Sequence, residues 1–380
     1  MVTDLTPAEH FAPERCPRLV IKIGSALLVD GSGKVRRQWL KGVAEDVARR
    51  HAAGQKIMIV SSGAIALGAR MASLPKGGRA SLEDAQAAAA IGQIALSQCW
   101  AELLSERGLT AAQMLVTLED LEGRRRYLNA SATLGRLLSL GAVPVINEND
   151  SVATTEIRFG DNDRLAARIG QASGASGVIL LSDIDGLYTA NPQKDPDAVH
   201  IPQVNRIDAR IRAMADAGSA SGMGSGGMIS KLEAARIATS AGAHLAILSG
   251  KVDDPLQAFD RGARSTIFLA TRPENARRAW LAGRLVVKGV LRIDDGAAAA
   301  LRDGRSLLPA GVTAVEGQFS RGDLVTIMDS DGHALARGLI EYDAPDAERI
   351  VGLRSDALAD VLGHAPRAAM VHRDHMVLVG

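Results

Sequence analysis

Short apolar runs alternate with long helical stretches through the first two thirds of this chain. Five runs are rich in β-branched residues and apolar at nearly every position, and they cover residues 19–23, 56–60, 143–146, 177–181 and 243–248. Strands of a parallel sheet that is covered by helices on both faces have this pattern. Helices are predicted between them over residues 37–53, 82–107 and 124–140. This part of the chain is therefore predicted to be an α/β domain of three layers, with a mainly parallel sheet between two layers of helices.

The pattern changes near residue 272, beyond which short strands recur at close intervals with Gly and Asp turns. These predicted strands cover residues 284–287, 312–315, 323–328 and 334–340. The sequence Asp329-Ser330-Asp331-Gly332 between the last two predicts a hairpin turn. The domain organisation that we expect is an N-terminal extension over residues 1–17, an α/β domain over 18–270, a linker over 271–284 and a small β-rich barrel or sandwich with one or two helices over 285–380.

Composition narrows the classes of function. The 380 residues are enough for two or three domains, and a formal net charge of +1 gives no general reason to bind nucleic acid or a membrane. Aromatic residues make up only 3% of the chain, which argues against a platform for stacking bases. Cys16 and Cys99 are too few for a disulfide framework or a zinc site, so we expect free thiols. The N-terminus lacks the pattern of a signal peptide, and no apolar run reaches the roughly 20 residues that span a bilayer. We therefore expect a cytoplasmic protein.

The segment from Gly222 to Lys231 combines glycines, a helix start and a cation. Four glycines in six residues let the backbone approach an anion closely. The helix that is predicted to start at Lys231 offers unpaired N–H groups and a positive dipole end, and the lysine adds a full charge. The spacing differs from that of a Walker A motif, and a flexible surface loop is the alternative interpretation of the glycine cluster taken alone.

Polar residues follow four of the predicted strands where each strand ends. They are Lys22 before Gly24-Ser25, then Ser61-Ser62-Gly63, Asn147-Glu148-Asn149-Asp150 and Ser182-Asp183, and the loop Gly160-Asp161-Asn162-Asp163 precedes another predicted helix. Ligands of parallel α/β sheets bind beyond the carboxyl ends of the strands. We therefore expect these residues to gather at one edge of the sheet.

Lys22 has two interpretations. It is either a residue of an edge strand whose head group reaches water, or a buried charge that meets an anion beside the Gly-Ser turn. The second interpretation, combined with Lys231, places two cations at two ends of one cleft. In-line phosphoryl transfer needs such charges, because negative charge spreads over the oxygens of the transferred group.

Asp150, Asp161 and Asp163 have three interpretations: helix caps or solvated loop charges, oxygen ligands of Mg²⁺, or groups that hold a substrate ammonium and orient the two lysines. We favour a mixture, in which Asp163 positions the lysines and Asp150 faces a cationic group of the substrate. Asn147 and Asn162 would add hydrogen bonds that fix direction. No histidine lies among these motifs, which argues against acid–base catalysis by histidine.

These segments together resemble the amino acid kinase family, and within it the enzymes that phosphorylate the γ-carboxylate of glutamate. Six blocks match in order and spacing: residues 20–25, 60–65, 143–150, 159–163, 186–192 and 224–231. The β-rich end of the chain is similar to a PUA domain. At the positions of Ser182 and Ser225 the family most often has threonine, but serine keeps the hydroxyl group.

The resemblance implies ATP-dependent phosphorylation of L-glutamate to L-glutamyl 5-phosphate, the first step of proline biosynthesis, with Mg²⁺. The γ-carboxylate has a reference pKa of about 4.3, so it is ionised at neutral pH and needs no general base. Lys22 and Lys231 would contact the ATP phosphates, and Asp163 would organise both lysines. The implied glutamate site comprises Ser62, Asp150 and Asn162, with Asn147 and Asp161 nearby. The implied ATP site comprises Lys22, Ser182, Asp183, Ser225, Gly226, Gly227, Met228, Ile229, Ser230 and Lys231, and no metal ligands are assigned.

Partners and rival functions follow from the same resemblance. It implies feedback inhibition by proline, hand-over of the acyl phosphate to glutamate-5-semialdehyde dehydrogenase, and a homo-oligomer, either a dimer or a tetramer. One rival is a kinase of the same fold that acts on N-acetylglutamate, aspartate or carbamate; the β-rich domain and the Asn-Glu-Asn-Asp block argue against it. PUA domains elsewhere bind RNA, but basic and acidic residues are interspersed in this domain, so we expect no RNA binding.

Overall fold

Two compact units make up the described chain. The structure, a computed structural model, describes residues 5–29, 35–152, 161–217, 227–270, 286–367 and 369–379. The first unit contains the described residues up to 270 other than 122–129. The second unit contains residues 122–129 and the described residues from 286 onward. Each unit has its own hydrophobic core.

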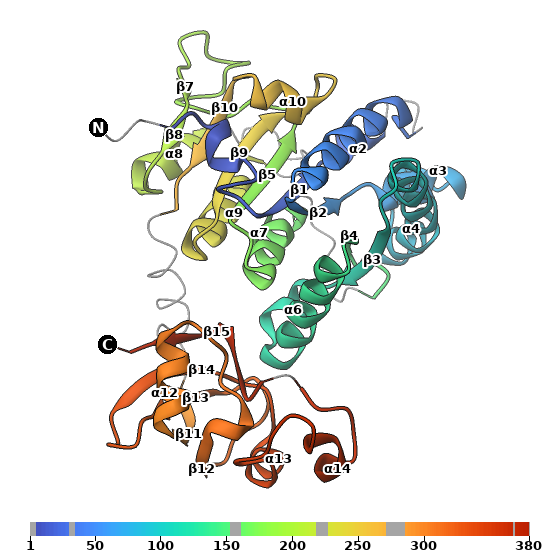
Figure 1. Ribbon diagram of the computed structural model, residues 1–380. Helices are drawn as coiled ribbons and strands as arrows, with labels where there is room; N and C mark the ends of the chain where they lie inside the picture. The colour runs from blue at the N-terminus through green and yellow to red at the C-terminus, as the bar shows by residue number, and fades with distance from the viewer. Residues whose placement is uncertain are drawn as a thin grey trace. The chain divides into compact units, whose positions relative to one another are not determined.

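Eight strands form one sheet in the first unit (Figure 1). They are β1 (Arg18–Ile23), β2 (Lys56–Ser61), β3 (Ala111–Val116), β4 (Val143–Glu148), β5 (Gly177–Ser182), β8 (Gln203–Val204), β9 (His244–Ser249) and β10 (Ser265–Phe268). Their order across the sheet is β3-β4-β2-β1-β5-β9-β10-β8, and neighbours run parallel except β9 and β10. Two further strands, β6 (Leu187–Tyr188) and β7 (His200–Ile201), form a separate antiparallel pair. The predicted, mainly parallel sheet is confirmed.

Helices precede, connect and follow these strands. The α-helices before residue 270 are α1 (Ser25–Leu28), α2 (Arg37–Ala52), α3 (Ala64–Met71), α4 (Leu82–Ser105), α5 (Leu118–Glu122), α6 (Arg124–Ser139), α7 (Asp161–Ser173), α8 (Ala209–Ala217), α9 (Met228–Ser240) and α10 (Pro255–Asp260). Two short 3₁₀-helices, η1 (Ala8–Phe11) and η2 (Pro75–Gly78), accompany them. In the part of the chain that the structure describes, no helix has the length and apolar character that crossing a membrane requires.

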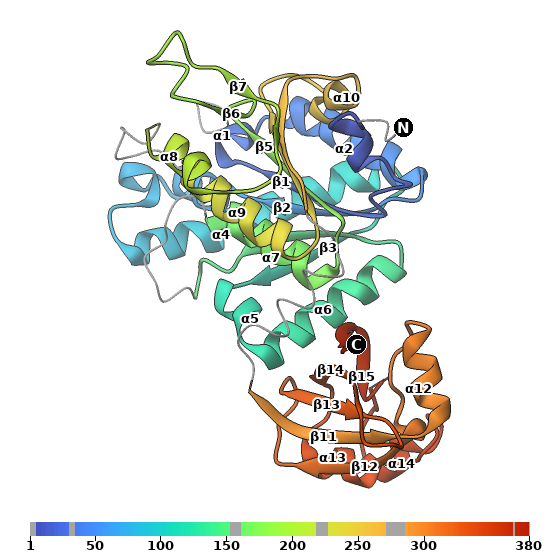
Figure 2. The same cartoon turned by 90° about the vertical axis from the view of Figure 1, so that its left-hand side faces the viewer.

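The side chains of β1 alternate between the two faces of the sheet. Leu19, Ile21 and Ile23 belong to the buried cluster that also contains side chains of α2, α4 and α10. Val20 and Lys22 point to the opposite face, because successive side chains of a strand alternate, and Lys22 meets α7 there. Figure 2 shows α7 and α9 side by side. The three-layer arrangement is confirmed, and it turns one lysine of an apolar strand toward two helices.

Most predicted elements are present, and the errors have local causes. The five predicted strands are β1, β2, β4, β5 and β9, and the three predicted helices are α2, α4 and α6. The prediction missed β3, whose sequence Ala-Ala-Gln-Met-Leu-Val has neither clean alternation nor a run of β-branched residues. β3 is an edge strand, where only one neighbouring strand constrains the sequence. The prediction also missed β10, which runs against β9.

The segment before β1 is anchored in the core of the first unit. The side chains of Phe11 and Cys16 are fully buried. The side-chain amide of Gln55 donates hydrogen bonds to the backbone carbonyls of both residues, at 3.0 and 2.6 Å. Burial raises the pKa of the Cys16 thiol to about 12, so this thiol is protonated and unreactive at neutral pH. Cys16 and Cys99 are both free, as predicted.

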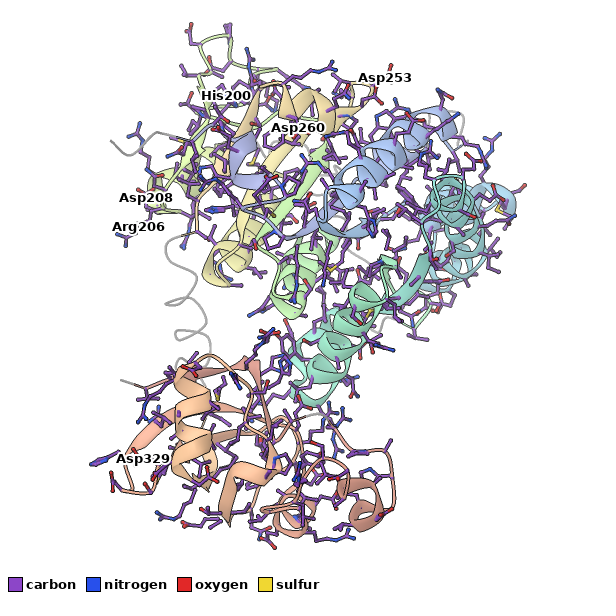
Figure 3. All side chains as sticks on the ribbon, viewed as in Figure 1. His200, Arg206, Asp208, Asp253, Asp260 and Asp329 are labelled. Atoms are coloured by element: carbon purple, nitrogen blue, oxygen red, sulfur yellow. The ribbon has the colours of Figure 1, made fainter. Side chains whose placement is uncertain are left out.

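The second unit is β-rich, as predicted. Its strands are β11 (Val287–Ile293), β12 (Val312–Gly317), β13 (Leu324–Met328), β14 (Ala334–Ile340) and β15 (Val371–Leu378), in the order β12-β11-β13-β14-β15. Its short helices are α12 (Asp295–Arg302), η3 (Pro309–Gly311), α13 (Ala344–Arg349) and α14 (Leu358–Leu362), which exceed the predicted one or two. The predicted hairpin turn joins β13 to β14, and Asp329 lies at its start (Figure 3).

Candidate active site

Four neighbouring strands of the first unit place polar residues at one edge of the sheet. β4, β2, β1 and β5 lie next to one another and run parallel, so their carboxyl ends are adjacent. β1 lies between β2 and β5, which excludes the interpretation of Lys22 as a residue of an edge strand. A charged side chain on an inner strand is buried, and its charge needs a partner there.

Two lysines from different elements meet one buried aspartate. Nζ of Lys22 in β1 lies 2.6 Å from Oδ1 of Asp163, and Nζ of Lys231 in α9 lies 3.1 Å from Oδ2 of the same residue. Asp163 lies in the first turn of α7, which begins at Asp161, so the prediction that residues 161–163 belong to a loop before the helix is wrong. The exposed fractions of the Lys22, Asp163 and Lys231 side chains are 9, 0 and 6%. The two cations, which the sequence argument placed at two ends of a cleft, thus share one carboxylate.

Burial and the neighbouring charges shift the pKa values of Lys22 and Asp163. Burial lowers the pKa of Lys22, the Asp163 carboxylate opposes that shift and Lys231 adds to it, so the pKa stays below its ordinary value. Burial raises the pKa of Asp163, but the two lysines outweigh burial and hold it below its ordinary value. Two ammonium groups thus meet one carboxylate in a buried site, and the charge of Asp183 also acts on Lys22. A negatively charged phosphate group is a natural further partner for such a pair of cations.

A second polar cluster begins at the neighbouring residue of the same helix. Nδ2 of Asn162 donates hydrogen bonds to Oγ of Ser62 at 2.7 Å and to Oδ1 of Asn147 at 3.3 Å. Consecutive residues of a helix point about 100° apart, so Asn162 and Asp163 face different neighbours. Ser62 follows β2, and Gly63 after it has a φ of 102°, which only glycine adopts without strain, before α3 begins. α7 therefore separates a cationic cluster from an uncharged one.

The amide of Asn147 also contacts helix α4. Its Nδ2 group donates to Oε1 of Gln93 at 2.9 Å. Gln93 and Asp150 line a cavity of about 280 Å³ between α4, β3 and the end of β4. Asp150 is half-buried, and its negative charge favours the charged form of Arg79, whose pKa burial lowers. Asp150 therefore shares a cavity with a residue that contacts Asn147.

A larger cavity lies beyond the end of β5. Ser182 is the last residue of β5, and its hydroxyl donates to Oδ1 of Asp183 at 3.1 Å. Asp183 lines a cavity of about 400 Å³ with residues of β9, α10 and the segment after β5. Asp185 and Arg264 line it too, and the hydroxyl of Tyr188 joins them: it donates to Asp185 at 2.9 Å and accepts from Arg264 at 3.2 Å.

The glycine-rich segment leads into α9, as predicted, but the helix begins earlier. Gly227 is its N-cap residue, and Met228, Ile229 and Ser230 precede Lys231 in its first turn. The predicted start at Lys231 is therefore wrong by three residues, because a Gly-Met-Ile-Ser sequence gives no clear signal for a helix start. Two predicted site residues, Ser225 and Gly226, lie outside the described residues. Asp161 begins α7, and its side chain also lies outside the described part of the chain.

Comparison with known proteins decides the family. The model of the amino acid kinase family matches residues 17–249, more than half of the chain, and the match contains Lys22, Asp163 and Lys231. The chain belongs to the amino acid kinase family. A model of the PUA domain matches residues 289–362 of this kinase.

Relatives of this amino acid kinase match it over nearly its whole length. The glutamate 5-kinase of Sphingopyxis alaskensis is 68% identical over 369 residues, which cover 97% of this chain and 99% of that protein. The glutamate 5-kinase of Zymomonas mobilis is 64% identical, over 97% of this chain and 93% of that protein. Among solved structures, a UMP kinase from Bacillus anthracis is 13% identical with a TM-score of 0.47, over 68% of this chain and 97% of that chain.

Two groups at the candidate site of this kinase were not predicted from the sequence. Gln93 follows Gly92 in an alanine-rich stretch of α4, where a lone amide among small apolar residues was the available signal. Arg264 meets Tyr188 although 76 residues separate them, so no local pattern indicates their contact. Both contacts form because segments distant in the sequence pack together, and a local sequence motif does not indicate such packing.

Proposed function

We propose that this amino acid kinase transfers the γ-phosphoryl group of ATP to the γ-carboxylate of L-glutamate, forming L-glutamyl 5-phosphate and ADP in the first step of proline biosynthesis. One observation carries the proposal: consecutive residues of α7 contact a cationic cluster and an amide–hydroxyl cluster. The first suits a transferring phosphoryl group and the second suits an amino acid beside it. The names of the relatives, glutamate 5-kinases, support glutamate as the acceptor.

Lys22 and Lys231 are the proposed contacts to the transferred phosphoryl group. Their two positive charges lie in a buried site, where electrostatic interactions are stronger than in bulk water. Asp163 is the proposed organiser of the pair, because each of its oxygens holds one ammonium group in place. Charged groups that are fixed in this way need little reorganisation during a reaction.

The chemical step needs no general base, since the γ-carboxylate, with a reference pKa of about 4.3, is ionised at neutral pH. One carboxylate oxygen attacks the γ-phosphorus while the bond from that phosphorus to the β,γ-bridging oxygen breaks. The bridging oxygen keeps the electron pair and leaves as part of ADP. Repulsion between two anions is the main obstacle, so the site acts by positioning the reactants and neutralising their charge.

The proposed glutamate site comprises Ser62, Asn162 and Asp150, with Asn147 and Asp161 close by. Hydrogen bonds among Ser62, Asn162 and Asn147 support this assignment, because they fix the directions of a hydroxyl and two amides next to the cationic cluster. Asp150 offers a carboxylate to the α-ammonium group of glutamate. Its place on the wall of the 280 Å³ cavity supports that role.

The proposed nucleotide site extends from the lysines to the cavity beside Asp183. The cavity of about 400 Å³ has room for a nucleoside, and the N-terminus of α9 offers N–H groups to phosphate oxygens. The residues assigned to ATP are Lys22, Ser182, Asp183, Ser225, Gly226, Gly227, Met228, Ile229, Ser230 and Lys231.

Mg²⁺ is proposed to enter as the MgATP complex. Both oxygens of Asp163 are paired with lysines, so this carboxylate does not offer the open oxygen ligands that Mg²⁺ prefers. Within the described residues, the cluster of at least three metal-ligating side chains that comes close enough together is Asp329, Asp331 and His333, in the second unit. We therefore expect phosphate oxygens and water, rather than a protein cage, to hold the ion.

A coupled assay of ADP formation with MgATP tests the function. It is run with L-glutamate, N-acetyl-L-glutamate, L-aspartate and carbamate as acceptors. We expect ADP formation with free L-glutamate, because a carboxylate beside the acceptor site favours a substrate with an ammonium group. Exclusive use of N-acetylglutamate would end the assignment to glutamate.

Further assignments rest on the same function. We propose domain boundaries at residues 18–270 and 285–380, with an extension over 1–17 and a linker over 271–284. We propose that the enzyme works in the cytoplasm as a dimer or tetramer and that proline inhibits it. Because an acyl phosphate hydrolyses readily, rapid hand-over to glutamate-5-semialdehyde dehydrogenase is also proposed. Size-exclusion chromatography and an assay with added proline test the oligomer and the inhibition.

A further inference from the structure

We propose that Gln93 is a positioning residue for the amino acid substrate: it orients the amide of Asn147 and, through Asn147, the amide of Asn162. The proposal rests on the proposed function, because it concerns the acceptor site of that reaction. Gln93 lies in α4, on a segment that carries no motif and that the functional assignment does not use.

A continuous series of hydrogen bonds links Gln93 to Ser62. Nε2 of Gln93 donates to Oγ of Ser97 at 3.1 Å, and Oε1 of Gln93 accepts from Nδ2 of Asn147 at 2.9 Å. Oδ1 of Asn147 then accepts from Nδ2 of Asn162, which also donates to Ser62. An amide has one accepting end and one donating end, so each member of the series takes its orientation from the one before it.

The series leaves two groups suited to an amino acid at its far end. Oδ1 of Asn162 is buried and has no hydrogen-bond partner among the described residues. A buried acceptor without a partner is costly, and the ammonium group of a substrate would supply one. Oγ of Ser62 accepts from Asn162, and a hydroxyl that accepts one hydrogen bond can still donate its own hydrogen, for example to a carboxylate of the substrate.

The hydrogen bond from Asn147 to Gln93 sets the orientation of the Asn147 side-chain amide. Asn147 is 2% exposed, so a rotated amide would find no water to replace the lost acceptor. Without Oε1 of Gln93, the Nδ2 group of Asn147 loses its partner and nothing holds Oδ1 toward Asn162. The Asn162 amide is then free to turn, and the acceptor meant for the ammonium group is misplaced.

The packing of α3 against α4 brings Gln93 to this point. A Cβ atom at Gly92 would overlap the backbone carbonyl of Ala64, and one at Gly68 would overlap that of Ala88. The two glycines therefore permit a close approach of the helices. This approach places the residue after Gly92 within hydrogen-bond distance of a side chain at the end of β4.

Kinetics of Gln93→Met test the proposal, since methionine keeps the length of the side chain but offers no amide. We expect the KM for L-glutamate to rise about tenfold or more, with the KM for MgATP and kcat within about twofold of wild type. Gln98→Met is the matched control on the same helix, where the amide donates to the exposed Glu102. This control should leave all three constants unchanged.

A double variant separates positioning through Asn147 from a general effect on structure. In an Asn147→Ala background, Gln93→Met should change the KM for glutamate by less than about twofold, because the group through which Gln93 acts is gone. Thermal unfolding shows whether each variant is folded. If the double variant does not fold, the kinetics of Gln93→Met alone decide the proposal.

Each outcome decides the matter. A normal KM for glutamate in Gln93→Met, an equal rise in both KM values, or an undiminished effect in the Asn147→Ala background would overturn the proposal. If the wild-type enzyme forms no ADP with glutamate, the proposed function itself fails and this inference fails with it. An active wild type with an unaffected Gln93→Met enzyme removes only the role of Gln93.

Discussion

Asp163 is the residue that joins the two lysines of the proposed phosphoryl site. It has no exposed surface, and its two oxygens hold ammonium groups that come from β1 and from α9. Loss of this carboxylate would remove the ion-pair partner that Lys22 and Lys231 share and leave two buried like charges close together, which destabilises a protein strongly. Loss of one lysine instead leaves a neutral pair and a folded site with less attraction for an anion. The lysines are therefore the residues to vary in a test of catalysis.

We expect Lys231→Ala to lower kcat by about 100-fold or more while the protein stays folded, because the lost charge counts most in the transition state. Steady-state kinetics with MgATP and glutamate measure the change, and circular dichroism checks the fold. Lys41→Ala, on the exposed side of α2, is the control and should have normal kinetics. Normal turnover by Lys231→Ala would contradict the assigned role.

The buried Lys22 predicts an alkaline limit to activity. Burial lowers its pKa against the opposing effect of Asp163, so the ammonium group loses its proton below the ordinary lysine value of 10.5. Because the charged form is the one that meets phosphate, kcat should be full below this lowered pKa and fall above it. The pH profile of kcat measures the midpoint. A kcat that stays constant through pH 10.5 would exclude a role for the charge of Lys22.

Stability should change in the opposite direction over the same range. The pKa of Lys22 is lower in the folded state than in the unfolded state, so the unfolded chain binds the proton more tightly. The contribution of Lys22 to the free energy of unfolding therefore rises as pH increases between the two values. A loss of kcat that accompanies an intact fold thus reports deprotonation rather than unfolding.

Helices α3 and α4 illustrate how the packing of two helices can position a residue that belongs to no motif. Gly68 and Gly92 lie where a side chain would enter the backbone of the other helix. Gln93, the residue after Gly92, then reaches Asn147. The glycines of this pair matter because of close approach, since each has an ordinary helical backbone.

We expect Gly92→Ala to reduce the free energy of unfolding by about 1–3 kcal/mol, because the added methyl group forces α3 and α4 apart. Gly135→Ala in α6 is the matched control, where a Cβ atom would meet nothing within 4 Å. There the better helix propensity of alanine should instead raise stability by roughly 0.5–1 kcal/mol. Chemical denaturation measures both values, and equal effects of the two substitutions would contradict the packing argument.

The sequence predicted the features that a local pattern of residues determines. Apolar runs gave the inner strands, and strand ends with polar residues indicated where Lys22, Ser62 and Asn147 would lie. It failed at β3, an edge strand with a weak pattern, and at Gln93, whose partner lies 54 residues later in the chain. The shared carboxylate of Asp163 was only partly foreseen, because the distance between two side chains depends on how α7 and α9 pack.

Each unit of the molecule has a large hydrophobic core of its own. The core of the first unit involves β1, α2, α4 and α10, and that of the second unit is built from residues 291 onward. Neither core contains a residue of the other. Lys22, Asp163 and Lys231 all belong to the first unit, as do both cavities. The residues proposed for the kinase chemistry therefore lie in one unit, while the matched PUA domain lies in the other.

A chain that ends near residue 275 should therefore fold and bind ATP. Its core keeps the buried cluster that fixes β1 against α2 and α4. Thermal unfolding with and without MgATP measures this, and the nucleotide should raise the melting temperature because it binds the folded state only. An insoluble or non-binding fragment would show that the two units depend on each other.

A crystal structure with a non-hydrolysable ATP analogue, Mg²⁺ and glutamate tests the central claim most directly. The account predicts that the Nζ atoms of Lys22 and Lys231 both lie about 3 Å from oxygens of the terminal phosphate, with the glutamate γ-carboxylate facing that phosphorus and Asn162 beside the amino acid. A complex in which either ammonium group faces away from the terminal phosphate would contradict it.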